Sequence, residues 1–107
     1  MTGLGQKTES KPMIFAVNRS TVPIEDLGKR GADKVRVQYL IDERHGSNRF
    51  ALRIYTVEKG GHTPLDEHDY EHHVYVLKGT GLLRETKNNS MTFRSLSEGD
   101  ALFVPSN

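Results

Sequence analysis

A chain of 107 residues is long enough for one small domain with a single hydrophobic core. Because it contains no cysteine, disulfide bonds, thiolate metal sites and a cysteine nucleophile are excluded. Its formal net charge is +1, and its basic residues are dispersed over turns and alternating positions, which argues against a nucleic-acid partner.

The N-terminal residues are polar, which predicts a disordered leader over 1–11 and a folded domain over 12–107. They lack the apolar segment and the cleavage site of a secretory signal peptide. No apolar run in the sequence approaches the roughly 20 residues that span a membrane. Together with the absence of cysteine, these features predict a cytoplasmic protein without a membrane partner.

The first elements after the leader are two predicted strands separated by a loop. The apolar run 13–17 (MIFAV) is a short strand candidate, and 21–33 is a loop broken by proline and glycine. Segment 34–41 alternates with the two-residue period of a half-buried strand. Its apolar face carries Val35, Val37, Tyr39 and Ile41, and its polar face carries Lys34, Arg36 and Gln38.

Strands separated by turn residues continue to the end of the sequence. The turn 42–48 leads into a strand over 49–57, which we expect to end at the lysine and glycines of 59–61. Shorter strands are predicted at 72–78, 81–86, 91–96 and 101–104. Because no segment keeps a helical period, the pattern predicts an all-β fold, an antiparallel sandwich or barrel of which the jelly roll is one form.

Four of the five histidines fall within residues 60–81, among several carboxylates. Asp66, His68 and His72 have the same parity, so on an extended segment their side chains project to one face. Such convergence makes these three residues the candidate metal ligands. A turn at 69–71 is the alternative, and it would break the alternation between His68 and His72.

The donor types limit the choice of metal ion. Imidazole nitrogen and carboxylate oxygen suit divalent Mn, Fe, Zn, Ni or Cu better than Ca or Mg. Asp66 is either a true ligand, which gives a set of two histidines and one carboxylate, or a degenerate position that has lost its metal. His73 has the opposite parity and is expected to pack or pair on the other face.

The spacing of this segment resembles the first sequence motif of the cupin superfamily. Gly60, His68 and Gly79 match positions of that motif. Asp66 stands where a first histidine is usual, and His72 stands at the glutamate position, a replacement that some small manganese-type cupins also carry.

The resemblance covers residues 35–107 and implies a jelly-roll barrel that binds a divalent metal. In the second cupin motif, Gly99 and Pro105 match, and the sequence ends at Asn107, three residues before the fourth ligand. We therefore expect a barrel that lacks its last strands in this chain. The resemblance also implies a homodimer.

Cupins carry many functions, so three alternatives stay open for this sequence. The preferred one is a metal-dependent oxygenase or isomerase that acts on a small polar or anionic substrate. The others are a non-catalytic domain that binds or senses a small ligand, and a barrel that holds no metal. Arg53 is either a residue that binds a substrate anion through paired hydrogen bonds or an exposed strand arginine.

Overall fold

The computed structural model describes residues 13–64 and 69–106, so the predicted leader over 1–11 lies outside the described residues. The chain divides into two compact units, Met1–Leu65 and Asp66–Asn107. Strands dominate the described residues, together with two short 3-10 helices, η2 (Arg19–Thr21) and η3 (Glu43–His45). No helix in these residues is long and apolar enough to cross a membrane.

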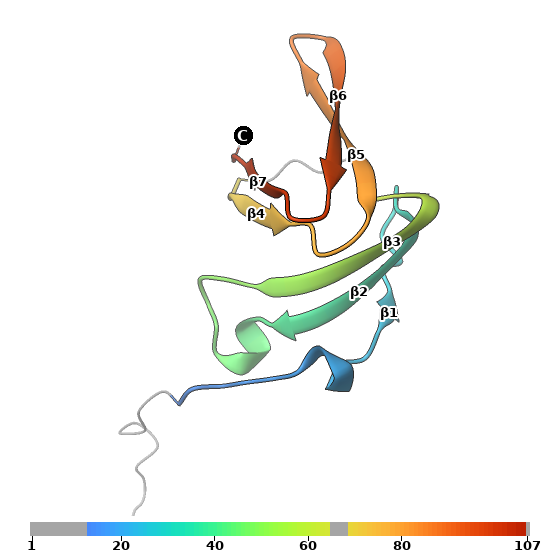
Figure 1. Cartoon of the computed structure of the whole chain (residues 1–107). Coiled ribbons are helices and arrows are strands. Elements are labelled where there is room, and N and C mark those ends of the chain that lie inside the picture. Colours follow the sequence, from blue (N-terminus) through green and yellow to red (C-terminus); the bar gives the residue numbers. More distant parts are fainter. Residues whose placement is uncertain (1–12, 65–68, 107) are drawn as a thin grey trace, which may run out of the picture. The chain divides into compact units, whose positions relative to one another are not determined.

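The first unit contains a three-stranded antiparallel sheet (Figure 1). Its strands are β1 (Glu25–Asp26), β2 (Asp33–Ile41) and β3 (Leu52–His62), with β2 in the centre. The predicted alternation in β2 places Val35 and Val37 in the core, where they are 2% and 1% exposed. These two valines are the buried hydrophobic residues of the described chain, so the core is centred on β2.

Gln38 departs from its predicted place on a solvent-facing side of β2. It is buried, because its side-chain amide donates hydrogen bonds to the backbone oxygens of Arg19 (2.8 Å) and Val22 (3.0 Å). Both amide hydrogens therefore have partners, and the amide ties the η2 segment to the sheet. Lys34 and Arg36, on the same predicted face, are exposed as expected.

The predicted turn between β2 and β3 is confirmed, and Asp42 organises it. Its carboxylate accepts a hydrogen bond from the backbone N–H of Arg44 (3.0 Å) and caps η3. The backbone N–H of Asp42 donates in turn to Nδ1 of His45 (3.1 Å). Gly46 then ends the helix with φ at 87°, a conformation that favours glycine.

The Arg44 guanidinium also binds the Asp42 carboxylate, and this contact predicts that the stability of the fold depends on pH. Nε and Nη2 of Arg44 donate to its two oxygens at 3.1 Å and 2.8 Å. These side-chain hydrogen bonds are the main reason that the pKa of Asp42 lies below its ordinary value of 3.8. A lowered carboxyl pKa stabilises the fold above the unfolded-state pKa, and this contribution is lost as the pH falls through the folded-state value.

We therefore expect the free energy of unfolding to fall as the pH drops below about 4, and expect Asp42→Asn to flatten that dependence. Urea unfolding between pH 6 and pH 2 measures the slope. The exposed Asp69 supplies the control substitution, Asp69→Asn, which should leave the slope in place. Equal acid slopes in the wild type and Asp42→Asn would contradict the assignment.

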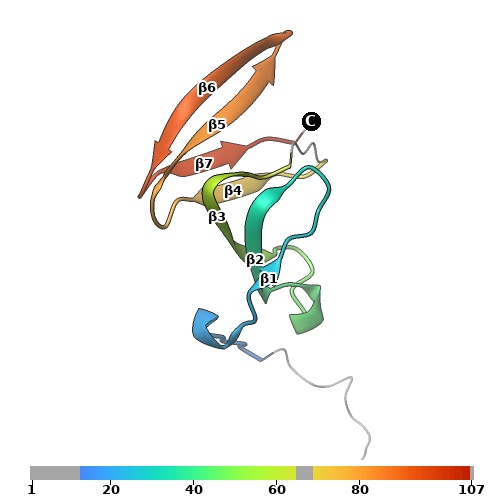
Figure 2. The same cartoon turned by 90° about the vertical axis from the view of Figure 1, so that its right-hand side faces the viewer.

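The second unit consists of two antiparallel pairs, one nested inside the other. Strand β4 (His72–Tyr75) pairs with β7 (Ala101–Val104), and between them in sequence β5 (Thr80–Lys87) pairs with β6 (Ser90–Ser97). Figure 2 shows the chain leaving β4, forming the β5–β6 hairpin and returning in β7. The β5–β6 turn is formed at 88–89.

The all-β, antiparallel fold predicted from the sequence is confirmed. No ladder among the described strands closes either unit into a barrel. In the second unit no described residue is buried, and large apolar side chains such as Leu82, Phe93 and Phe103 are exposed. The strand predicted at 13–17 is wrong, because this segment has no sheet partner among the described residues.

Candidate metal centre

His72 is the one predicted metal ligand that lies in the described part of the chain. It opens β4 opposite Val104 of β7, and Val74 and Leu102 form the next pair along the same face. The imidazole is half-buried and its Nε2 atom is buried. The buried Nε2 atom therefore lies on a sheet face whose other side chains, Val74, Leu102 and Val104, are apolar and partly exposed.

His73 follows His72 in β4 and lies on the opposite face of the strand. Its ring packs edge-on against the ring of its cross-strand partner Phe103, with centroids 5.7 Å apart. The expectation that His73 packs on the other face is therefore confirmed. Adjacent histidines with different surroundings make His73 the matched control for experiments on His72.

Asp66 and His68, the other two predicted ligands, lie outside the described residues. The described chain bends at Asp69 and Tyr70 and becomes a strand only at His72. Strand alternation therefore does not extend back from His72, and the alternative of a local turn is the one that the backbone follows. Residues 13–64 and 69–106 by themselves contain no group of three side chains that could hold a metal ion, so the three-residue centre stays a prediction.

Tyr70 is a neighbour of His72 that the sequence pattern did not single out. The two rings lie 4.8 Å apart at an interplanar angle of 40°. The chain bends at 69–70, just before β4 begins, and this bend brings the side chains of Tyr70 and His72 together. A tyrosine ring at this position restricts the orientation of the imidazole.

Arg53 and Tyr39 form a cationic and aromatic cluster in the first unit. They are direct cross-strand partners of β3 and β2, and the Arg53 guanidinium lies 5.7 Å from the centre of the Tyr39 ring. Arg44 lies 5.6 Å from the same ring. Arg44 is bound to Asp42, whereas Arg53 forms no ion pair within the described residues. The guanidinium of Arg53 is therefore the one in this cluster that can offer its donors to an anion.

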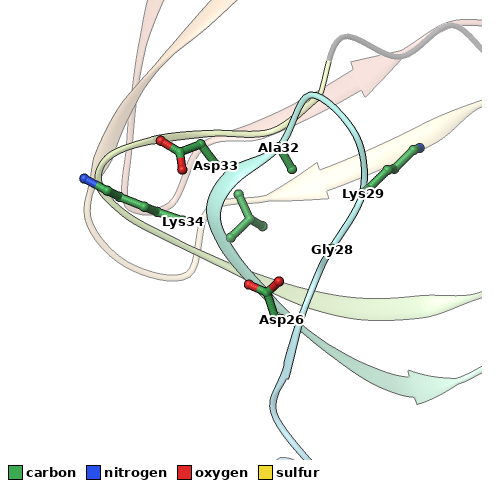
Figure 3. Close-up of a pocket in the computed structure, with 7 residues that line it drawn as sticks. Asp26, Gly28, Lys29, Ala32, Asp33 and Lys34 are labelled. Carbon is green, nitrogen blue, oxygen red and sulfur yellow. The ribbon is translucent and has the colours of Figure 1, made fainter.

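The first unit also contains an open hollow of about 300 Å³ in the loop before β2. Figure 3 shows the Lys29 and Lys34 ammonium groups on opposite sides of it. Its lining has no histidine, so it does not match the predicted metal centre. The lining residues are Asp26, Gly28, Lys29, Ala32, Asp33, Lys34 and Val35.

His62, at the end of β3, is the remaining histidine of the His-rich segment. It is exposed, and its Nδ1 lies 3.3 Å from the backbone oxygen of Thr63.

These features describe an all-β chain whose antiparallel strands carry a histidine on an apolar face and an arginine against an aromatic ring. The chain is similar to the solved structure of the polyketide cyclase RemF from Streptomyces resistomycificus, with a TM-score of 0.76 and 31% sequence identity. The similarity covers 88% of this chain, which spans 65% of the length of that structure. No family model and no curated protein matches the sequence.

Proposed function

We propose that this chain belongs to a cupin-type cyclase, an enzyme that closes rings in a small carbonyl-rich substrate of the polyketide class. The observation that supports this proposal is the similarity to the polyketide cyclase RemF, at 31% identity over 88% of the chain. The nested strand pairs of the second unit agree with a jelly roll, the fold of cupins. The absence of cysteine is compatible with the proposed location of the protein in the cytoplasm.

The proposed centre consists of Asp66, His68 and His72, which would hold one divalent transition metal ion. The donor set fits such an ion, and the structure supplies a buried His72 nitrogen on an apolar face. Such an ion would supply Lewis-acid polarisation of a carbonyl oxygen of the substrate.

The chain's own residues have two further proposed tasks. The neighbours of His72 on the same face, Val74 and Leu102, give the proposed ligand an apolar flank. In the first unit, Arg53 would offer its guanidinium donors to an anion, and Tyr39 fixes the orientation of that guanidinium by cation–π contact.

Ring closure of a linear poly-β-ketone thioester by the purified, metal-loaded protein tests the proposal directly. We expect a cyclic aromatic product, followed by ultraviolet absorbance and mass spectrometry, at a rate above that of the metal ion alone. The rate should fall at least about a hundredfold in His72→Ala and stay close to the wild type in His73→Ala. Metal binding without turnover on any such substrate would remove the enzymatic assignment and leave a small-ligand-binding domain.

A further inference from the structure

Each of the two adjacent histidines of β4 has an aromatic neighbour, and the two contacts differ in geometry. Phe103 is the cross-strand partner of His73 in β7, and the two rings meet edge-on at an interplanar angle of 73°. Tyr70 reaches His72 from the bend before β4, at 40° and with a shorter centroid distance, 4.8 Å against 5.7 Å. Tyr70 and Phe103 are similarly exposed, at 51% and 58%. The contact of Tyr70 is therefore the closer of the two, and it involves the proposed metal ligand.

The orientation of the His72 imidazole decides which ring atom an ion can meet. The torsion that turns an imidazole about its bond to Cβ has two broad minima related by a half turn. In the structure, Nε2 of His72 occupies a buried position. A half turn would put the carbon Cε1 where Nε2 now lies, and carbon cannot bind a metal ion. For this reason the surroundings of a metal-binding histidine normally fix the orientation of its ring.

The Tyr70 ring is placed to favour one of these two orientations. On an extended strand, side chains two residues apart are separated by about 6.5 Å. The bend at 69–70 brings the rings of Tyr70 and His72 closer than that, to a tilted arrangement within the range of aromatic contact. A half turn of the imidazole has to pass through orientations that disturb this contact, so the tyrosine ring opposes the exchange of Nε2 and Cε1.

We propose that Tyr70 is a positioning residue of the metal centre, whose ring holds the His72 imidazole so that Nε2 is presented to a divalent ion. This inference rests on the proposed metal centre. Because the contact is made by the ring, phenylalanine at position 70 should position His72 as well as tyrosine does. Leucine, which is apolar but has no ring, should not.

Titration calorimetry of the metal-free protein with Zn²⁺ measures the effect of the ring. Tyr70→Leu should weaken binding at least about tenfold, as loss of a group that orients a metal ligand does. Tyr70→Phe should restore binding close to that of the wild type. Phe103→Leu is the matched control, because it removes the aromatic neighbour of His73 at a similar exposure, and it should also bind Zn²⁺ like the wild type.

The visible absorption spectrum of the protein saturated with Co²⁺ tests the geometry of the site. Tyr70→Leu should change the bands of the bound ion, while Tyr70→Phe and Phe103→Leu should keep them. Equal Zn²⁺ affinity in Tyr70→Leu and the wild type, or equal losses in Tyr70→Leu and Phe103→Leu, would overturn the role of Tyr70 and leave the metal centre in place. A wild type that binds no divalent ion would remove both, whereas metal binding without ring closure would remove the enzymatic proposal alone.

Discussion

Replacing His72 with alanine is expected to remove most of the divalent metal that the purified protein holds. The substitution deletes one of three proposed ligands and leaves Asp66 and His68, too few to hold the ion tightly. Replacing a residue that only hydrogen-bonds to a metal ligand lowers the affinity for the metal roughly 10- to 100-fold. Loss of His72, itself a proposed ligand, should lower the affinity for the metal by more than that. Elemental analysis of protein prepared without added metal, followed by titration calorimetry with Mn²⁺ and Zn²⁺, measures the loss.

His73→Ala is the control for this experiment, because His73 lies on the opposite face and contacts Phe103. It should keep the metal content of the wild type. His68→Ala should reproduce the loss seen in His72→Ala, and Asp66→Ala separates the two interpretations of that position. Metal loss in Asp66→Ala identifies a ligand, and full retention identifies a degenerate position. Unchanged metal content in both histidine variants would remove the proposed centre altogether.

The strands were predictable from the sequence wherever local pattern and tertiary environment agree. Segment 34–41 alternates because one face of β2 is covered, and the observed strand Asp33–Ile41 differs from the prediction by one residue. The hairpin strands predicted at 81–86 and 91–96 are observed as Thr80–Lys87 and Ser90–Ser97. The Asn88–Asn89 turn between them adopts positive φ at both positions, as a tight hairpin requires.

Most of the failures depend on contacts with residues that are distant in the sequence. Gln38 lies at a polar position in the alternation of β2, yet it is buried, and its side-chain amide binds backbone oxygens of the 19–22 segment. The apolar run 13–17 has strand composition but pairs with no strand among the described residues. Tyr39 was predicted only as an apolar-face residue, and the two arginines beside it come from different parts of the chain.

The predicted end of the strand at 59–61 is also wrong, because β3 continues through these residues to His62. The register with β2 shifts there, so that Asp33 pairs with His62 and Val35 pairs with Val57. The intervening residue Lys34 adopts φ of 55°, and Gly60 adopts φ of 83°. Glycines that would end a strand in isolation instead allow a bulge, since the sheet partner continues past them.

Gly61→Ala at this bulge is expected to destabilise the protein by about 2–3 kcal/mol, which corresponds to a fall in Tm of roughly 10 °C or more. A Cβ atom at Gly61 would lie 2.5 Å from the backbone oxygen of Asp33 and 2.8 Å from the Cβ of Lys34. It would also lie 3.1 Å from the backbone oxygen of Glu58. Two of these neighbours are backbone atoms of the paired strands, so relief of the clash requires the bulge itself to move.

Gly81→Ala isolates this steric cause, because a Cβ at Gly81 in β5 meets no atom within 4 Å. It changes glycine to alanine in a strand just as Gly61→Ala does, and it should alter stability by less than about 1 kcal/mol. Urea and thermal unfolding of the two variants give the comparison, and backbone hydrogen exchange in β2 and β3 locates the change. If Gly61→Ala is no less stable than Gly81→Ala, the close approach of β3 to Asp33 at the bulge is wrong.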